Sequence, residues 1–189
     1  MSLRIIGGIF RGRRIKAPKN EATRPALESL RESMFNICQN RIQGATVLDL
    51  FAGSGAIGFE ALSRGANSVI FVEKDRKAMR AISENIELLD VKTQAKLIPM
   101  DAFLVLPKLK SHFFDLICID PPYDIVNQEM KEGLFMQILD LGLLHEKGVL
   151  FFEERVSAKQ KAIPCEIEGL HLKSSRRFGS TSLEEYIRQ

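Results

Sequence analysis

Residues 47–58 read VLDLFAGSGAIG, and this stretch decides the fold. A β-branched and apolar run ends here in a glycine-rich turn, which a small-residue helix follows through Leu62 to Gly65. Glycines let the backbone approach a ligand closely and adopt φ values that other residues avoid. The helix that begins after the turn points unpaired N–H groups at the same place. The stretch therefore predicts a buried strand, a ligand-binding turn and a helix.

The same order of strand and helix repeats downstream. We expect strands at 46–50, 68–73, 95–99, 114–119 and 148–153, with helices between them at about 55–64, 75–89 and 127–141. Buried strands joined by helices form a parallel sheet with right-handed crossovers. Residues 170–188 instead predict an antiparallel hairpin at the sheet edge. The expected fold class is α/β: a Rossmann-like, mostly parallel, doubly wound sheet with this C-terminal hairpin.

Positive charge is concentrated at the N-terminus. Residues 1–44 hold nine Lys and Arg against three acids, net +6, whereas residues 45–189 hold eighteen against twenty-one, net −3. Residues 3–17 predict a short hairpin, and Pro25 can open a helix. Basic side chains that neutralise phosphates release condensed counterions, so this extension favours nucleic acid as a partner. The densest cluster consists of Arg11, Arg13, Arg14, Lys16 and Lys19.

Length and composition predict one domain over residues 1–189, made of the basic extension (1–44) and a Rossmann-like core (45–189). With 189 residues and 45% apolar content, the chain can bury a substantial core. No run approaches the length of a membrane span, and no secretory start is present. The three cysteines and three histidines show no ligand spacing. We therefore expect no metal, no disulfide, no membrane, and a monomer in the cytoplasm.

A second motif, DPPY at residues 120–123, follows the apolar run 114–119. Two consecutive prolines cannot extend a central strand, because each removes a backbone donor and fixes φ. The chain must therefore leave the strand abruptly with a carboxylate, exposed carbonyls and an aromatic ring. These groups suit a planar base with an exocyclic amine. Asp120 and the Pro121 carbonyl can accept its two N–H bonds, while Tyr123 stacks on the ring.

Acidic residues fall at or just past the ends of four predicted strands. Ligands of such sheets bind at the carboxyl ends of the strands, so these side chains should converge on one cleft. A single acid there would indicate only a turn, because Asp commonly ends strands. Four acids in order are better explained by a binding site: Asp49, Glu73, Asp101 and Asp120.

Residues 53–58 also match the G-x-G-x-x-G pattern of dinucleotide sites, with Glu73 about twenty residues on. A nicotinamide enzyme is therefore one interpretation. Asp49 argues against it, because a buried acid repels a diphosphate and attracts a cationic sulfonium ligand with an amino group. Asp49 favours S-adenosylmethionine over NAD.

Taken together, these motifs resemble the bacterial RsmD family, the 16S ribosomal RNA guanine-N2 methyltransferases, over the whole chain. DPPY is shared with other amino-methyltransferases, including adenine-N6 DNA enzymes, so the N-terminal stretches are the more family-specific part. The matching stretches are residues 4–8, 11–13, 23–25, 31–36, 48–66, 120–123 and 177–179.

The resemblance implies methyl transfer from S-adenosylmethionine to a guanine amine of ribosomal RNA. The substrate RNA can be free or part of an assembled or partly assembled small subunit. The catalytic residues it implies are Asp120, Pro121, Pro122 and Tyr123. The cofactor-binding residues it implies are Asp49, Phe51, Ala52, Gly53, Ser54, Gly55, Glu73, Lys74, Asp101, Ala102 and Asp120. The expected RNA-binding residues are Arg11, Arg13, Arg14, Lys16, Arg24 and Arg31.

Two questions stay open at the level of sequence. Thr23, Arg24 and Arg31 can hold either the cofactor carboxylate or an RNA phosphate, and Phe103 can be either a site or a core residue. For the function, the alternatives are a DNA adenine-N6 methyltransferase and a non-catalytic RNA-binding protein of the same fold.

Overall fold

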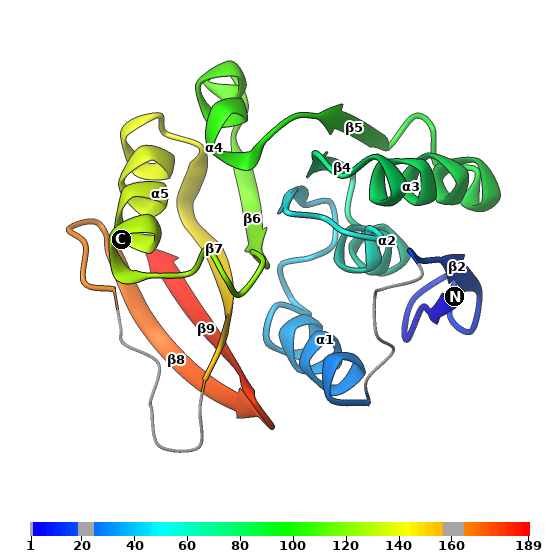
Figure 1. The fold of residues 1–189 in the computed structure, drawn as a ribbon, viewed down its shortest axis with the longest axis horizontal. Helices are drawn as coiled ribbons and strands as arrows, with labels where there is room; N and C mark the ends of the chain where they lie inside the picture. The colour runs from blue at the N-terminus through cyan, green and yellow to red at the C-terminus, as the bar shows by residue number, and fades with distance from the viewer. Residues whose placement is uncertain (1, 19–24, 157–164) are drawn as a thin grey trace.

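A central sheet of seven strands organises the computed structural model, which describes residues 2–18, 25–156 and 165–189. Strands β3 to β7 are parallel, whereas β9 pairs antiparallel with β7 and β8 antiparallel with β9, in the order β5-β4-β3-β6-β7-β9-β8. Figure 1 shows the C-terminal hairpin at one end of the sheet. This topology confirms the predicted Rossmann-like fold with an antiparallel edge hairpin. The strands are β3 (Thr46–Leu50), β4 (Ser68–Glu73), β5 (Ala95–Pro99), β6 (Phe114–Ile119), β7 (Leu144–Arg155), β8 (Leu170–Phe178) and β9 (Thr181–Arg188).

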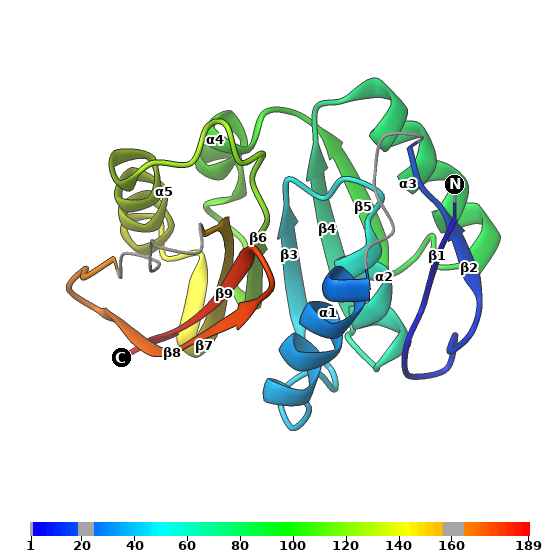
Figure 2. The same ribbon diagram turned by 60° about the horizontal axis from the view of Figure 1, so that its bottom comes forward.

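Helices cover both faces of the sheet (Figure 2). Successive strand residues point to opposite faces, so Val47 and Leu48 belong to two different core clusters. One cluster joins the sheet to α1, α2 and α3, and the other joins it to α4, η1 and α5. The helices are α1 (Pro25–Ile37), α2 (Ala56–Ser63), α3 (Arg76–Leu89), α4 (Ala102–Val105), η1 (Leu106–Leu109) and α5 (Gln128–Asp140).

Most element bounds agree with the sequence to within about two residues. Asp75 caps α3, because its side chain accepts hydrogen bonds from the N–H groups of Lys77 and Ala78. Two differences stand out. Strand β7 begins at Leu144 instead of 148, and the short helices α4 and η1 had not been predicted between β5 and β6.

The N-terminal hairpin covers residues 2–16, close to the expected 3–17, and packs on the helices of the core. Its strands are β1 (Ser2–Arg4) and β2 (Arg14–Lys16). The connecting residues lie against α2. There the buried carboxylate of Glu60 accepts hydrogen bonds from the backbone N–H groups of Ile6 and Gly7, each 2.8 Å long. Figure 1 shows the hairpin beside α2 and α3.

Two further observations concern the described residues alone. No helix in residues 2–18, 25–156 and 165–189 is both long and apolar enough to cross a membrane. Over the same ranges, no three His, Cys, Asp or Glu side chains come together in a way that could hold a metal ion. Cys38, Cys118 and Cys165 are free thiols, and all three are buried.

Candidate active site

The turn after β3 is built from residues in the left-handed region of φ. Phe51, Gly53 and Gly55 have φ values of 59°, 53° and 78°. Such values favour glycine, and they fold the backbone tightly between the end of β3 and the start of α2. Gly58 serves a different purpose: a Cβ atom there would lie 2.2 Å from the ring of Phe71, so its absence lets α2 pack directly on β4.

Asp49, the penultimate residue of β3, is buried against the first turn of α2. Its side chain is 1% exposed, and Oδ2 accepts a hydrogen bond from the backbone N–H of Gly58 over 3.0 Å. The first turn of α2 carries the positive end of the helix dipole, so a carboxylate is stabilised there. Asp49 therefore places a negative charge directly beneath the glycine-rich turn.

Glu73 ties the same turn to the end of β4. Its Oε2 accepts a hydrogen bond from Gly53 N–H over 2.8 Å, while Oε1 accepts from the N–H groups of Lys74 at 2.7 Å and Asp75 at 2.8 Å. A carboxylate has about four acceptor positions, so three backbone donors leave it capacity for a further donor. Glu73 is partly exposed, which makes that position accessible.

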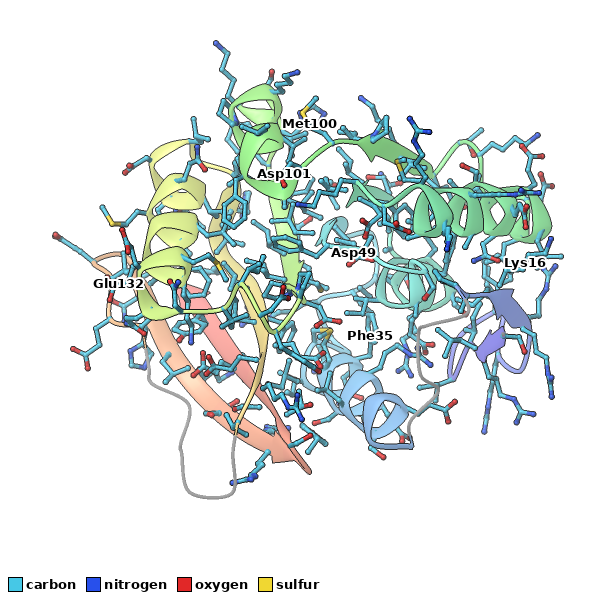
Figure 3. All side chains as sticks on the ribbon, viewed as in Figure 1. Lys16, Phe35, Asp49, Met100, Asp101 and Glu132 are labelled. Carbon is cyan, nitrogen blue, oxygen red and sulfur yellow. The ribbon has the colours of Figure 1, made fainter. Side chains whose placement is uncertain are left out.

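An ion pair connects the ends of β4 and β5. Lys74 Nζ lies 2.8 Å from Asp101 Oδ2, and Asp101 Oδ1 accepts a hydrogen bond from Phe103 N–H as the cap of α4. The hydrogen bond from Lys74 lowers the pKa of Asp101, and the same bond raises the pKa of Lys74. Figure 3 shows Asp49 and Asp101 in the middle of the molecule.

Two aromatic rings lie next to this pair. Phe51 and Phe103 meet edge to face with ring centroids 5.9 Å apart. Both rings are only partly buried, and both pack against the core cluster on the α4 and α5 side. Phe103 is thus partly core and partly exposed beside the turn, so neither alternative from the sequence describes it alone. Ala102, which opens α4, is buried.

The DPPY segment leaves β6 at the same edge of the sheet. Asp120 N–H donates to the Leu50 carbonyl over 3.4 Å, and the Pro122 carbonyl accepts from Ile125 N–H over 3.1 Å. Pro121 is buried, Asp120 is partly buried, and Pro122 is exposed. Tyr123 keeps 39% of its surface exposed. The segment therefore forms a turn whose Asp120 lies next to the end of β3, while its Tyr123 ring lies toward β7.

The four acids predicted from strand ends lie along one edge. Asp101, Glu73, Asp49 and Asp120 follow or end the neighbouring strands β5, β4, β3 and β6. Ala52 connects two of these ends, because its N–H donates to the carbonyl of Val72 over 3.0 Å. The structure thus brings these acids together, while the role of each stays a prediction.

The expected RNA-binding residues divide into three groups. Arg11, Arg13, Arg14 and Lys16 are exposed on the N-terminal hairpin, and Figure 3 shows Lys16 beside α3. Arg13 and Lys16 also make local contacts, to the Leu88 carbonyl at 2.6 Å and to Glu84 at 2.8 Å. Thr23, Arg24 and Lys19 lie outside the described residues.

Arg31 forms the third group, and its surroundings differ from the expectation. It is only 6% exposed, and its Nη2 donates to the Arg4 carbonyl over 2.7 Å. Its Nε lies 3.8 Å from the buried Glu60 carboxylate. These contacts join α1 to the N-terminal segment and to α2, and the assignment of Arg31 to RNA or cofactor stays a prediction.

Two polar residues near the site were missed at the level of sequence. Asn85 on α3 is buried; its side chain accepts from Lys16 N–H at 2.7 Å and donates to the carbonyls of Lys16 at 2.9 Å and Ser54 at 3.3 Å. Its signal was a polar residue on the apolar stripe of α3. Glu153 on β7 is buried beside Tyr123, and its signal was again an acid near the end of a strand.

Comparisons with known proteins agree with this geometry. A family model described as "Conserved hypothetical protein 95" matches residues 3–187. The Bacillus subtilis protein "Putative rRNA methyltransferase YlbH" is 32% identical over 97% of this chain and 98% of its own length. Escherichia coli "Ribosomal RNA small subunit methyltransferase D" is 31% identical over 86% of this chain and 80% of its own.

Solved structures share the architecture. "Putative methyltransferase yhhF from Escherichia coli" superimposes with a TM-score of 0.85 and 30% identity, covering 100% of this chain and 99% of that one. The structure "SMU.776, a putative methyltransferase complexed with SAH" has a TM-score of 0.66 and 17% identity, covering 83% of this chain and 49% of that one. The second likeness shows the fold alone.

Proposed function

The chain belongs to the RsmD family, and we propose that it transfers a methyl group from S-adenosylmethionine to the N2 amine of a guanine in 16S ribosomal RNA. The observation that carries the proposal is the adjacency of two turns on neighbouring strands. The glycine-rich turn of β3 and the DPPY turn of β6 meet where Asp120 N–H binds the Leu50 carbonyl. A cofactor held by the first turn and a base held by the second would therefore lie side by side.

The residues of the first turn fit S-adenosylmethionine. This ligand carries a sulfonium and an ammonium group, and the strand ends offer four carboxylates with Lys74 as the cation paired among them. A diphosphate would be repelled by the same charges. Glu73, which keeps acceptor capacity, would hold the ribose hydroxyls. Asp49 and the backbone of Gly53 and Gly55 would hold the methionine half.

The adenine would lie at the end of β5. Asp101 and Ala102 would bind its amine and ring edge, with Phe51 and Phe103 as the aromatic wall. Because Asp101 is paired with Lys74 over 2.8 Å, an adenine amine would compete with that lysine for the carboxylate. Lys74 is exposed and Asp101 partly exposed, so the pair contributes little to stability and costs little to exchange.

When bound, S-adenosylmethionine supplies an electrophilic methyl group. The chain's own contribution is to hold and polarise the target amine. Asp120 and the Pro121 carbonyl accept its two N–H bonds and stabilise the positive charge that develops on nitrogen. Tyr123 stacks on the base and orients it. Fixing the reactants in this way can remove several kcal/mol of the barrier, up to about 7–11.

Recognition of RNA would come from the hairpin and the rim of the cleft. Arg11, Arg13 and Arg14 are exposed on the hairpin. A guanine within folded RNA is reached in a loop or by flipping, so shape and phosphate contacts select the site. The proposed substrate is ribosomal RNA, either free or in an assembled or partly assembled small subunit.

The decisive experiment is nucleoside mass spectrometry of ribosomal RNA from cells with and without the gene. We expect loss of one N2-methylguanosine from 16S RNA and its restoration by the purified protein with S-adenosylmethionine. An unchanged RNA profile with loss of N6-methyladenine from DNA would replace the proposal with the DNA enzyme. Unchanged RNA and DNA would leave a non-catalytic RNA-binding protein.

A further inference from the structure

The hydroxyl group of Tyr123 is held by a buried acid on the neighbouring strand. Tyr123 Oη donates a hydrogen bond to Glu153 Oε1 over 3.3 Å. Glu153 is 3% exposed and follows Phe152, which pairs in register with Ile119 at the end of β6. Glu153 therefore stands level with Asp120, on the next strand of the sheet.

A further contact restrains the same ring. The guanidinium carbon of Arg155 lies 5.9 Å from the centroid of the Tyr123 ring. The hydroxyl and the ring are thus both contacted by side chains of β7. Even so, 39% of the Tyr123 surface stays exposed and available to a base.

The buried position of the Glu153 carboxylate lowers the stability of the folded protein. On its own face of the sheet, Phe151, two residues before it on β7, and Leu183, its partner on β9, are buried apolar residues. A carboxylate buried among them loses hydration that one hydrogen bond from a neutral hydroxyl does not restore. Burial raises the pKa of Glu153 from 4.5 to about 7. An apolar residue would pack here at lower cost, which points to a role in the site instead.

We propose that Glu153 is a positioning residue: it holds the Tyr123 hydroxyl and so fixes the aromatic ring on which the target guanine stacks. The inference rests on the proposed function, because it takes Tyr123 as the stacking surface. A tyrosine on an unsupported turn would sample several rotamers, and binding of the base would then have to fix one of them. A ring fixed in advance avoids that entropic cost.

The test is a double-mutant cycle in single-turnover methyl transfer. Tyr123→Phe and Glu153→Ala each remove one side of the contact and should each slow transfer roughly tenfold, the effect of losing a hydrogen bond to an acid. The double variant should be no slower than either single variant, because both lose the same interaction.

Glu153→Gln keeps an acceptor oxygen and should recover most of the rate. Glu146→Ala, at an exposed acid on the same strand, is the matched control.

Affinity for S-adenosylhomocysteine should stay within twofold in every variant, so the loss would lie in the transfer step. Additive effects in the cycle, or a Tyr123→Phe enzyme as fast as the wild type, would overturn the positioning role. Tyr123→Phe removes a single oxygen from a partly exposed side chain, so it tests the contact even where Glu153→Ala fails to fold.

A spectroscopic measurement tests the contact without any activity. The chain has two tyrosines and no tryptophan. Burial raises the pKa of Tyr186 so far that this residue does not titrate in an ordinary alkaline titration. The pKa of Tyr123 is raised less, by burial and by the charges of Glu153 and Asp120. Tyrosinate absorbance should therefore report Tyr123, and Glu153→Gln should lower its pKa. An inactive wild type that still showed this shift would refute the proposed function and leave the contact standing; an unchanged pKa would refute the contact.

Discussion

Replacing Glu153 by glutamine should make the protein more stable at pH 8 while leaving its stability nearly unchanged at pH 4. The carboxyl group of Glu153 is buried on β7, and burial raises its pKa from 4.5 to about 7. Between these two values the folded state binds more protons than the unfolded state. The free energy of unfolding of the wild type therefore falls as the pH rises through this interval.

The size of the effect follows from the same values. One pKa unit corresponds to about 1.4 kcal/mol, so the contribution of Glu153 should decline by at most about 3 kcal/mol between pH 4.5 and 8. Glutamine cannot ionise and still offers an oxygen to Tyr123, so it escapes this loss. Against a typical domain stability of about 5–15 kcal/mol, the difference is easily measured.

Several charged or titratable groups surround Glu153, and the comparison is designed to cancel them. Tyr123 contacts it from the turn after β6, where Asp120 also lies, Arg155 lies two residues along β7, and Glu185 lies on β9 opposite Phe151. Their own titration is common to both proteins, so only the difference between variant and wild type is interpreted.

The assay is urea unfolding of both proteins at pH values from 4 to 8. Glu146→Gln, at an exposed acid of β7, should show a pH-independent difference of less than about 0.5 kcal/mol. If the difference for Glu153→Gln were equally flat, Glu153 would ionise as freely as a surface residue, and the argument from its burial would be refuted.

Three other predictions concern binding and chemistry. Asp120→Ala should abolish methyl transfer while the affinity for S-adenosylhomocysteine, measured by calorimetry, changes less than about threefold; near-normal single turnover would contradict its role as amine acceptor. Glu73→Ala should weaken that affinity roughly tenfold, because both the ribose contact and the Gly53 anchor are lost, and titration with NAD should give no binding. Neutralising Arg11, Arg13 and Arg14 together should weaken RNA binding and reduce its salt dependence by about one log-log unit per lost phosphate contact; an unchanged slope would exclude the hairpin from the interface.

The sequence predicted the parts of this site that depend on local pattern. The glycine-rich turn and DPPY each occupy one continuous stretch, and the carboxyl ends of parallel strands share an edge in any right-handed α/β sheet. Knowing that Asp49, Glu73 and Asp120 end strands was therefore enough to expect them at one edge. The adjacency of β3 and β6 bears this out.

Residues whose partners are distant in sequence could not be placed in this way. Arg31 looks like any other basic residue of a basic segment, and only the fold reveals the Arg4 carbonyl and Glu60 as its partners. A count of charges cannot distinguish a buried arginine from an exposed arginine that binds a phosphate. Glu153 was missed because its contact Tyr123 follows a different strand, β6. Neither local sequence shows that β6 and β7 are neighbours in the sheet.

The connection between the basic hairpin and the glycine-rich turn is the most consequential of these distant contacts. The Asn85 side chain binds the Lys16 backbone and the Ser54 carbonyl together, while Glu60 binds the backbone of Ile6 and Gly7. Each bond is buried or partly buried, so breaking it leaves an unsatisfied polar group at a cost of about 1–3 kcal/mol. The hairpin therefore cannot shift without disturbing the turn or the helix that follows it. The packing of α2 and α3 thus fixes the distance between the surface proposed for RNA and the turn proposed for the cofactor, and under that proposal it would set how far the target base lies from the RNA segment on the hairpin.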